Sequence, residues 1–119
     1  MKNKAIGTIE AERDHVLEQM REIRSAHPGG VSEQFLKGTR QDKAGIVERG
    51  PYFSLQWYEN GKPRRQRLRR PEQVQQAREE TSNCKRIYEL AERFAELTRR
   101  LGEIERDEKA AVERQKKGL

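Results

Sequence analysis

The chain contains no proline after Pro71, and the stretch from Pro71 to Gln115 restricts the fold more than any other feature. Pro71 suits the first position of a helix, and Glu72 follows it where a negative charge complements the helix dipole. About 44 residues at a rise of ~1.5 Å would make a helix of ~66 Å. We therefore expect one helix to take more than a third of the 119 residues.

The predicted helix over 71–115 carries an apolar stripe. Its apolar residues recur at helical spacing, and pairs such as Glu89 and Arg93 lie at i,i+4 among the charged residues. The stripe is longer than one short helix can cover, so we expect part of it to pack on a second copy of the chain. This oligomer or partner interface is predicted at Ile87, Leu90, Phe94, Leu97, Leu101 and Ile104.

A shorter amphipathic helix is expected over residues 8–26. Pro28 disfavours helix in the residue before it, and Gly29 and Gly30 leave the backbone free to turn, so the helix should end there. Its apolar residues recur on one face and the remaining face is charged. The apolar residues are Ile9, Val16, Leu17, Met20 and Ile23.

Residues 31–70 are predicted to form a three-stranded antiparallel meander. A turn is expected over 42–45, and the pair Asn60-Gly61 favours a two-residue type I′ turn, which needs positive φ at both positions. The predicted fold class is α+β, mainly helical, with coiled-coil character in the long helix. Charged residues make up 39% of the chain, against about 25% in an ordinary globular domain. This composition favours a single elongated domain over 1–119.

The net charge of the chain resides in nine residues. The sequence carries 26 Lys and Arg against 20 Asp and Glu, and positive and negative residues cancel everywhere outside 62–70. That segment, "KPRRQRLRR", contains six basic residues and no acid. A single-sign cluster in an otherwise balanced chain points to a polyanionic partner such as nucleic acid.

A turn at Asn60-Gly61 fixes which residues lie opposite each other in the hairpin. One face then pairs Phe53 with Leu68, Leu55 with Gln66, and Trp57 with Arg64, and it should lie on the helices. The other face pairs Tyr52 with Arg69, Ser54 with Arg67, and Gln56 with Arg65. Arginines on that face recur at about 6.8 Å, twice the rise of an antiparallel strand.

The basic hairpin has two interpretations. Arginine donates paired hydrogen bonds to phosphates, and a two-stranded ribbon fits the DNA major groove, which favours nucleic-acid binding. Antiparallel sheets also keep one solvated face, and charges on edge strands protect against aggregation, so the arginines could serve that purpose alone. On the first interpretation the site consists of Lys62, Arg64, Arg65, Arg67, Arg69 and Arg70, with Tyr52, Gln56 and Tyr58 able to stack or hydrogen-bond.

No arrangement of residues indicates catalysis, a metal or a cofactor. Neither His15 nor His27 has a partner at the spacing of a metal site or catalytic triad, and the glycines match no phosphate-binding loop. The single cysteine, Cys84, lies in the apolar stripe and excludes an internal disulfide. We expect a protein that is not an enzyme, in a reducing, cytoplasmic environment. No apolar run reaches the ~20 residues of a membrane span.

Residues from about Gly30 to Leu97 resemble a family of small, mostly uncharacterised bacterial and archaeal proteins that are often associated with transposable elements. The resemblance rests on "GGVSEQFLKGTRQ", on "ERGPYFSLQWYENGKPRRQRLRRPEQVQQAREE" and on "NCKRIYELAERFAELTRRL", in that order. It implies a helix, a small sheet and a long helix, with a link to nucleic acid. Many members carry a cysteine cluster where this chain has none, so no zinc site is implied here.

These observations lead to two functional hypotheses. The first is a small basic accessory protein, linked to a mobile element, that binds DNA or RNA through the hairpin and forms a homo-oligomer through the long helix. The second is a coiled-coil interaction or assembly module in which the hairpin covers the base of the helix and binds no nucleic acid.

Overall fold

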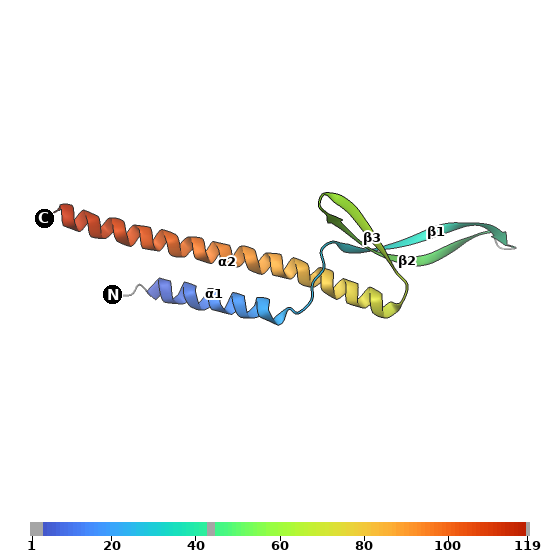
Figure 1. The fold of residues 1–119 in the computed structure, drawn as a ribbon, viewed down its shortest axis with the longest axis horizontal. Helices are drawn as coiled ribbons and strands as arrows, with labels where there is room; N and C mark the ends of the chain where they lie inside the picture. Colours follow the sequence, from blue (N-terminus) through green and yellow to red (C-terminus); the bar gives the residue numbers. More distant parts are fainter. Residues whose placement is uncertain (1–3, 43–44, 119) are drawn as a thin grey trace. The chain divides into compact units, whose positions relative to one another are not determined.

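The structure, a computed structural model, describes residues 4–42 and 45–118, with side chains for 4–35 and 51–118. It confirms a mainly helical α+β fold (Figure 1). The chain divides into two compact units: a helical unit, Met1–Arg24 with Arg86–Leu119, and a sheet unit, Ser25–Lys85. The elements in chain order are α1 (Lys4–Glu22), β1 (Gly30–Asp42), β2 (Gly45–Glu59), β3 (Lys62–Leu68) and α2 (Pro71–Lys117).

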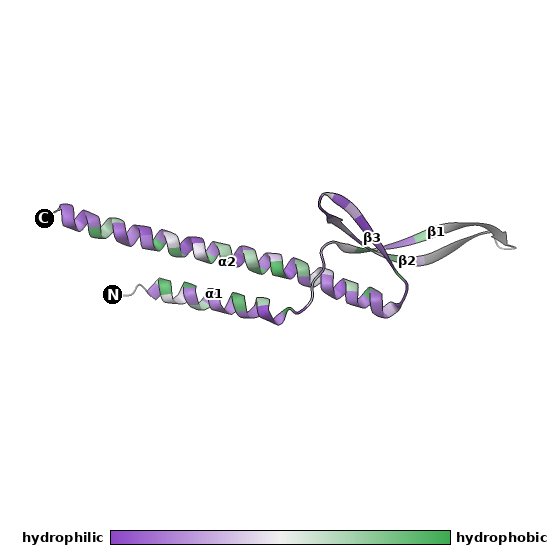
Figure 2. Ribbon diagram, in the orientation of Figure 1, coloured by the Kyte–Doolittle hydropathy of each residue, from purple (hydrophilic) through white to green (hydrophobic). Residues whose placement is uncertain are grey.

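In the helical unit, α1 runs antiparallel to the second part of α2 (Figure 1). Val16 of α1 packs against Leu90 and Leu97 of α2, and Leu97 is completely buried. Hydrophobic residues recur along both helices between hydrophilic ones (Figure 2), so each helix contributes an apolar stripe. An ion pair between Glu12 and Arg93, with N···O at 2.7 Å, flanks this core. The partly buried residues around it are Ile9, Met20, Ile23 and Phe94.

The first helix begins and ends about four residues earlier than the predicted range 8–26. The residues after Glu22 are not helical, because two of them bond to the first part of α2. The side chain of Asn83 donates to the carbonyl of Ser25 at 3.0 Å. The backbone N–H of His27 donates to the carbonyl of Glu80 at 2.9 Å. These bonds hold the segment in an extended course within the sheet unit.

The sheet has the strand order β1-β2-β3 and is antiparallel throughout, as predicted. Asn60 and Gly61 have φ angles of 52° and 77°, as the predicted type I′ turn requires. The register of the β2–β3 hairpin is confirmed from Phe53 opposite Leu68 to Trp57 opposite Arg64. The turn predicted over 42–45 falls on 43–44, which lie outside the described residues.

The apolar face of the sheet packs on the first turns of α2, as the hairpin register predicts. Leu55 and Leu68 from the sheet meet Val74 and Ala77 from the helix, and all four are buried. Val31, Phe53 and Trp57 are partly buried against this cluster. The edge of the His27 ring also meets Trp57, with centroids 4.7 Å apart at 87°. The opposite face of the sheet is thereby left to solvent or to a ligand.

Candidate nucleic-acid interface

The face of the sheet away from α2 collects side chains from all three strands. Residues that pair directly across antiparallel strands point to the same side. Gly30 lies opposite Gln56, which lies opposite Arg65; Ser32 lies opposite Ser54, which lies opposite Arg67. We call this surface the basic face. Its residues are Gly30, Ser32, Gln34, Tyr52, Ser54, Gln56, Tyr58, Arg65 and Arg67.

The two arginines of the basic face are held by neutral partners. The guanidinium of Arg65 donates to the side-chain oxygen of Gln34 at 3.0 Å. The guanidinium carbon of Arg67 lies 4.4 Å from the ring centroid of Tyr52, which is cation–π distance. Among the described side chains, 4–35 and 51–118, neither arginine forms an ion pair with a carboxylate. Both side chains are exposed and keep their full charge toward solvent.

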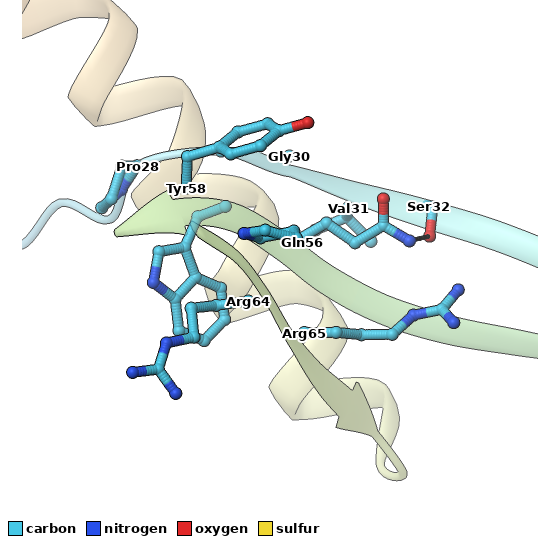
Figure 3. A pocket seen from close by; sticks show the side chains of 11 residues that line it. Pro28, Gly30, Val31, Ser32, Gln56, Tyr58, Arg64 and Arg65 are labelled. Atoms are coloured by element: carbon cyan, nitrogen blue, oxygen red, sulfur yellow. Dashed lines mark hydrogen bonds between the residues drawn. The ribbon is translucent and has the colours of Figure 1, made fainter. Parts of the chain in front are cut away.

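Small and amide side chains order the middle of the basic face. Gln56 donates from its side-chain nitrogen to the hydroxyl of Ser32 at 3.1 Å, shown as a dashed line in Figure 3. Ser54 is only 8% exposed, so the larger side chains around it cover it. The hydrogen bond between Gln56 and Ser32 joins β1 to β2 through side chains, in addition to the backbone pairing.

Two of the predicted basic residues, Lys62 and Arg64, lie on the other face of the hairpin. Lys62 pairs with Glu59 across the strands, and Arg64 pairs with Trp57. The guanidinium of Arg64 forms an ion pair with Glu59 at 3.3 Å, so part of its charge is compensated. Figure 3 shows the side chains of Arg64 and Arg65 extending in different directions from neighbouring positions of β3. The six basic residues therefore do not form one surface.

Arg69 and Arg70 lie at the junction of β3 and α2. Their backbone N–H groups both donate to the side-chain oxygen of Gln73, at 2.9 and 3.1 Å. A glutamine that reaches back to the first residues of a helix is half of a capping box. The predicted pair of Tyr52 and Arg69 does not form, because β3 ends at Leu68 and the cap takes the backbone of Arg69.

A groove beside this junction adds a residue that the sequence pattern did not indicate. Arg78, on α2, has its guanidinium carbon 5.5 Å from the ring centroid of Phe53. It adds a further positive charge to a groove that Arg67 of β3 also lines. A usable signal was the spacing of Val74 and Arg78, which places both on one side of the helix. The arginines that line the groove are Arg67, Arg69, Arg70 and Arg78.

The residues predicted as an oligomer or partner interface lie in the helical unit. Leu90, Phe94 and Leu97 pack against α1 within the chain itself. Leu101 is buried, and Ile87 and Ile104 are half-buried. The first three therefore already have a partner in this chain, and association through α2 stays a prediction.

Neither a metal site nor a membrane span is found in the described part of the chain. Among the side chains of residues 4–35 and 51–118, no group of three or more His, Cys, Asp or Glu residues could hold a metal ion. Within the same residues, neither helix contains a stretch apolar enough to cross a bilayer.

Comparison with known proteins does not suggest a function for the basic face. No family model, curated protein or solved structure matches the chain. The resemblance to the family associated with transposable elements stays a prediction. The functional argument therefore depends on the residues of the sheet unit and their contacts.

Proposed function

We propose that this protein binds nucleic acid through the basic face of its sheet. One observation carries the proposal: Arg65 and Arg67 share an exposed face, and their partners there are an amide and an aromatic ring. A surface that only needed to stay soluble would be served by mixed charges, as on the helices of this chain. Here the positive charge is held in place and left available for an external anion.

The proposed contacts are with phosphates. A guanidinium can donate two parallel hydrogen bonds to one phosphate, and it stays charged at any physiological pH. Gln34 and Tyr52 restrict Arg65 and Arg67 before binding, so less side-chain entropy is lost on binding. The groove with Arg69, Arg70 and Arg78 would extend the contact along the sugar-phosphate backbone of the nucleic acid. Lys62 and Arg64, on the other face of the hairpin, would add long-range electrostatic attraction for the nucleic acid.

The test is a binding titration with labelled duplex DNA, single-stranded DNA and structured RNA at two salt concentrations. Wild type is compared with an Arg65→Gln, Arg67→Gln double variant and with a matched Arg99→Gln, Arg100→Gln variant. If both sheet arginines contact phosphates, the double variant reduces the slope of log K against log salt by about 1.8 on duplex and about 1.4 on a single strand. The helix variant should bind as wild type. Absence of salt-dependent binding to all three probes would refute the proposal.

A second candidate function is association through α2. Val112 is 51% exposed, and it lies in a shallow groove with Glu105, Lys109 and Lys116. A second copy of the chain, or a protein partner, could cover it together with Ile104. Sedimentation equilibrium of wild type against an Ile104→Asp, Val112→Asp variant tests this. A concentration-dependent dimer that the variant abolishes would support it, and a wild-type monomer at high concentration would count against it.

The cellular setting is proposed from the sequence alone. A cytoplasmic location follows from the single cysteine, and an accessory role in a mobile element follows from the family resemblance. Neither affects the binding experiment, which uses the purified chain.

A further inference from the structure

A hollow lies at the end of the basic face nearest the hairpin turn (Figure 3). Its floor is formed where Gly30 of β1 pairs with Gln56 of β2. Glycine has no side chain, so the position beside Gln56 is empty, and an added Cβ at Gly30 would meet nothing within 4 Å. The rim is formed by Pro28, Ser32, Gln56, Tyr58, Pro63 and Arg65.

The wall of the hollow is fixed by a close backbone approach at Gly29. Its φ is +96°, and an added Cβ would lie 1.8 Å from the carbonyl oxygen of Gln56. Only glycine can take this position. The segment from Pro28 to Gly30 is therefore held against β2, and the hollow is a built feature of the fold.

The hollow contains the one aromatic ring of the basic face that has no partner among the described side chains. Tyr58 is 75% exposed. Tyr52, on the same face, is half-buried and already covered by Arg67. An exposed ring on the same face as arginines is a platform for a planar, electron-rich group that is attached to an anion. Gln56 adds hydrogen-bonding capacity, since its amide oxygen accepts no bond from a described side chain.

We propose that the hollow holds one unpaired nucleobase, stacked on Tyr58, while Arg65 and Arg67 bind the phosphates that flank it. The amide of Gln56 would hydrogen-bond to the edge of the base. In a duplex both faces of a base are already stacked, so only a single strand or a loop can offer one. This inference rests on the proposed function and names its substrate class: single-stranded nucleic acid.

The probe for the test is a fluorescein-labelled oligothymidylate, titrated beside a labelled duplex of mixed sequence. Removing the ring with Tyr58→Ala should weaken single-strand binding about tenfold, as expected for loss of one base stack. Tyr58→Phe should restore most of the affinity, because it keeps the ring. Tyr88→Ala is the matched control, since Tyr88 is 65% exposed on α2 and lies outside the proposed site.

A second variant fills the hollow without removing any group. Gly30→Val places a branched side chain beside Gln56, and the strand position favours valine. It should weaken single-strand binding by a similar factor and leave the melting temperature of the fold unchanged or higher. Trp57, the single tryptophan of the chain, packs on the opposite face of the sheet, so its fluorescence checks that the Gly30→Val variant keeps the fold.

The outcomes separate the two proposals. Tenfold loss in both variants, with single strand preferred over duplex in wild type, supports the base site. Binding that is salt-dependent but unchanged in both Tyr58→Ala and Gly30→Val overturns the base site and leaves the proposed function standing. If neither probe binds at low salt, the base site is overturned, and if structured RNA also fails to bind, the proposed function fails with it.

Discussion

The two units of this protein use the same side chain in opposite ways. In the helical unit Arg99 lies between two carboxylates, Glu96 and Glu103, and Arg93 pairs with Glu12. In the sheet unit the arginines of the basic face contact an amide and a phenol ring. Arg93 and Arg99 therefore neutralise charge within the chain, whereas Arg65 and Arg67 of the basic face have neutral partners.

The formal charge of +6 comes from residues 62–70 of the sheet unit, because the positive and negative residues of the rest of the chain cancel. Exposed ion pairs on a helix contribute a few tenths of a kcal/mol each, and they leave little field at a distance. A sheet face with neutral partners has no such cancellation, so its field can attract a polyanion. If the proposed function is correct, the sheet unit carries recognition, whereas the arginines Arg93 and Arg99 of the helical unit serve its internal ion pairs.

The largest expected effect concerns what holds the helical unit together. If apolar packing stabilises it and the ion pairs matter little, Leu97→Ala should lower the free energy of unfolding by about 3 kcal/mol. Leu97 has no exposed surface, so truncation leaves a cavity against Val16 and Leu90. Urea unfolding followed by circular dichroism measures the change. The control is Leu17→Ala, at a residue 42% exposed, which should cost less than about 1 kcal/mol. Equal losses would contradict this account.

In the sheet unit the corresponding weak point is a backbone contact. Gly29→Ala should lower stability by about 2–3 kcal/mol, because the methyl group meets the carbonyl of Gln56 and φ is positive. Gly30→Ala, one residue later, meets open space and should be neutral or stabilising. Thermal unfolding of the two variants gives a direct comparison. A stable Gly29→Ala variant would show that this segment is not held against β2 as described.

The sequence correctly predicted the hairpin register and the start of α2, but not the loss of the Tyr52–Arg69 pair. Asn60-Gly61 determines the hairpin register because a two-residue turn leaves no freedom in the pairing. Pro71 marks the start of α2 for an equally local reason. Arg65 and Arg67 lie on the opposite face of the hairpin from Arg64, because successive side chains of a strand point to opposite faces.

Features that depend on distant contacts could not be predicted in this way. The end of α1 at Glu22 is set by bonds from Asn83 and to Glu80, which are more than fifty residues away in the chain. The pairing of Gln34 with Arg65 depends on the register of β1. That register contains irregularities between Gln34 and Leu36 and between Lys37 and Gln41, and no residue pattern specifies them.

One substitution can give an arginine of the sheet a carboxylate partner, as the arginines Arg93 and Arg99 of the helical unit have. Gln34→Glu would give Arg65 a carboxylate partner in place of an amide, and we expect nucleic-acid affinity to fall about tenfold, or ~1.4 kcal/mol. The salt slope should also become shallower, because less charge remains for phosphates.

Gln34→Ala separates the effect of charge from that of positioning. It frees Arg65 without neutralising it, so affinity should fall only about threefold and the salt slope should stay as in wild type. Fluorescence anisotropy at several salt concentrations measures both quantities. If Gln34→Glu and Gln34→Ala behave alike, the neutral partner has no role in keeping the charge available.

The smallest expected effect concerns the ion pairs of Glu96 in the helical unit. A hydrogen bond from Arg99, together with the charge of Arg100, holds the pKa of Glu96 below its ordinary value. A carboxyl group with a lowered folded-state pKa stabilises the fold above its unfolded-state pKa, and this contribution is lost as pH falls through the folded value.

Glu96→Gln should therefore flatten the decline in melting temperature between about pH 5 and pH 3, with only a slight change near pH 7. Glu108→Gln is the control, since Glu108 forms no ion pair with a described side chain. Both helix variants should bind nucleic acid as wild type does. An effect of Glu96→Gln on binding comparable to that of Gln34→Glu would mean that the charges of the two units are not used differently.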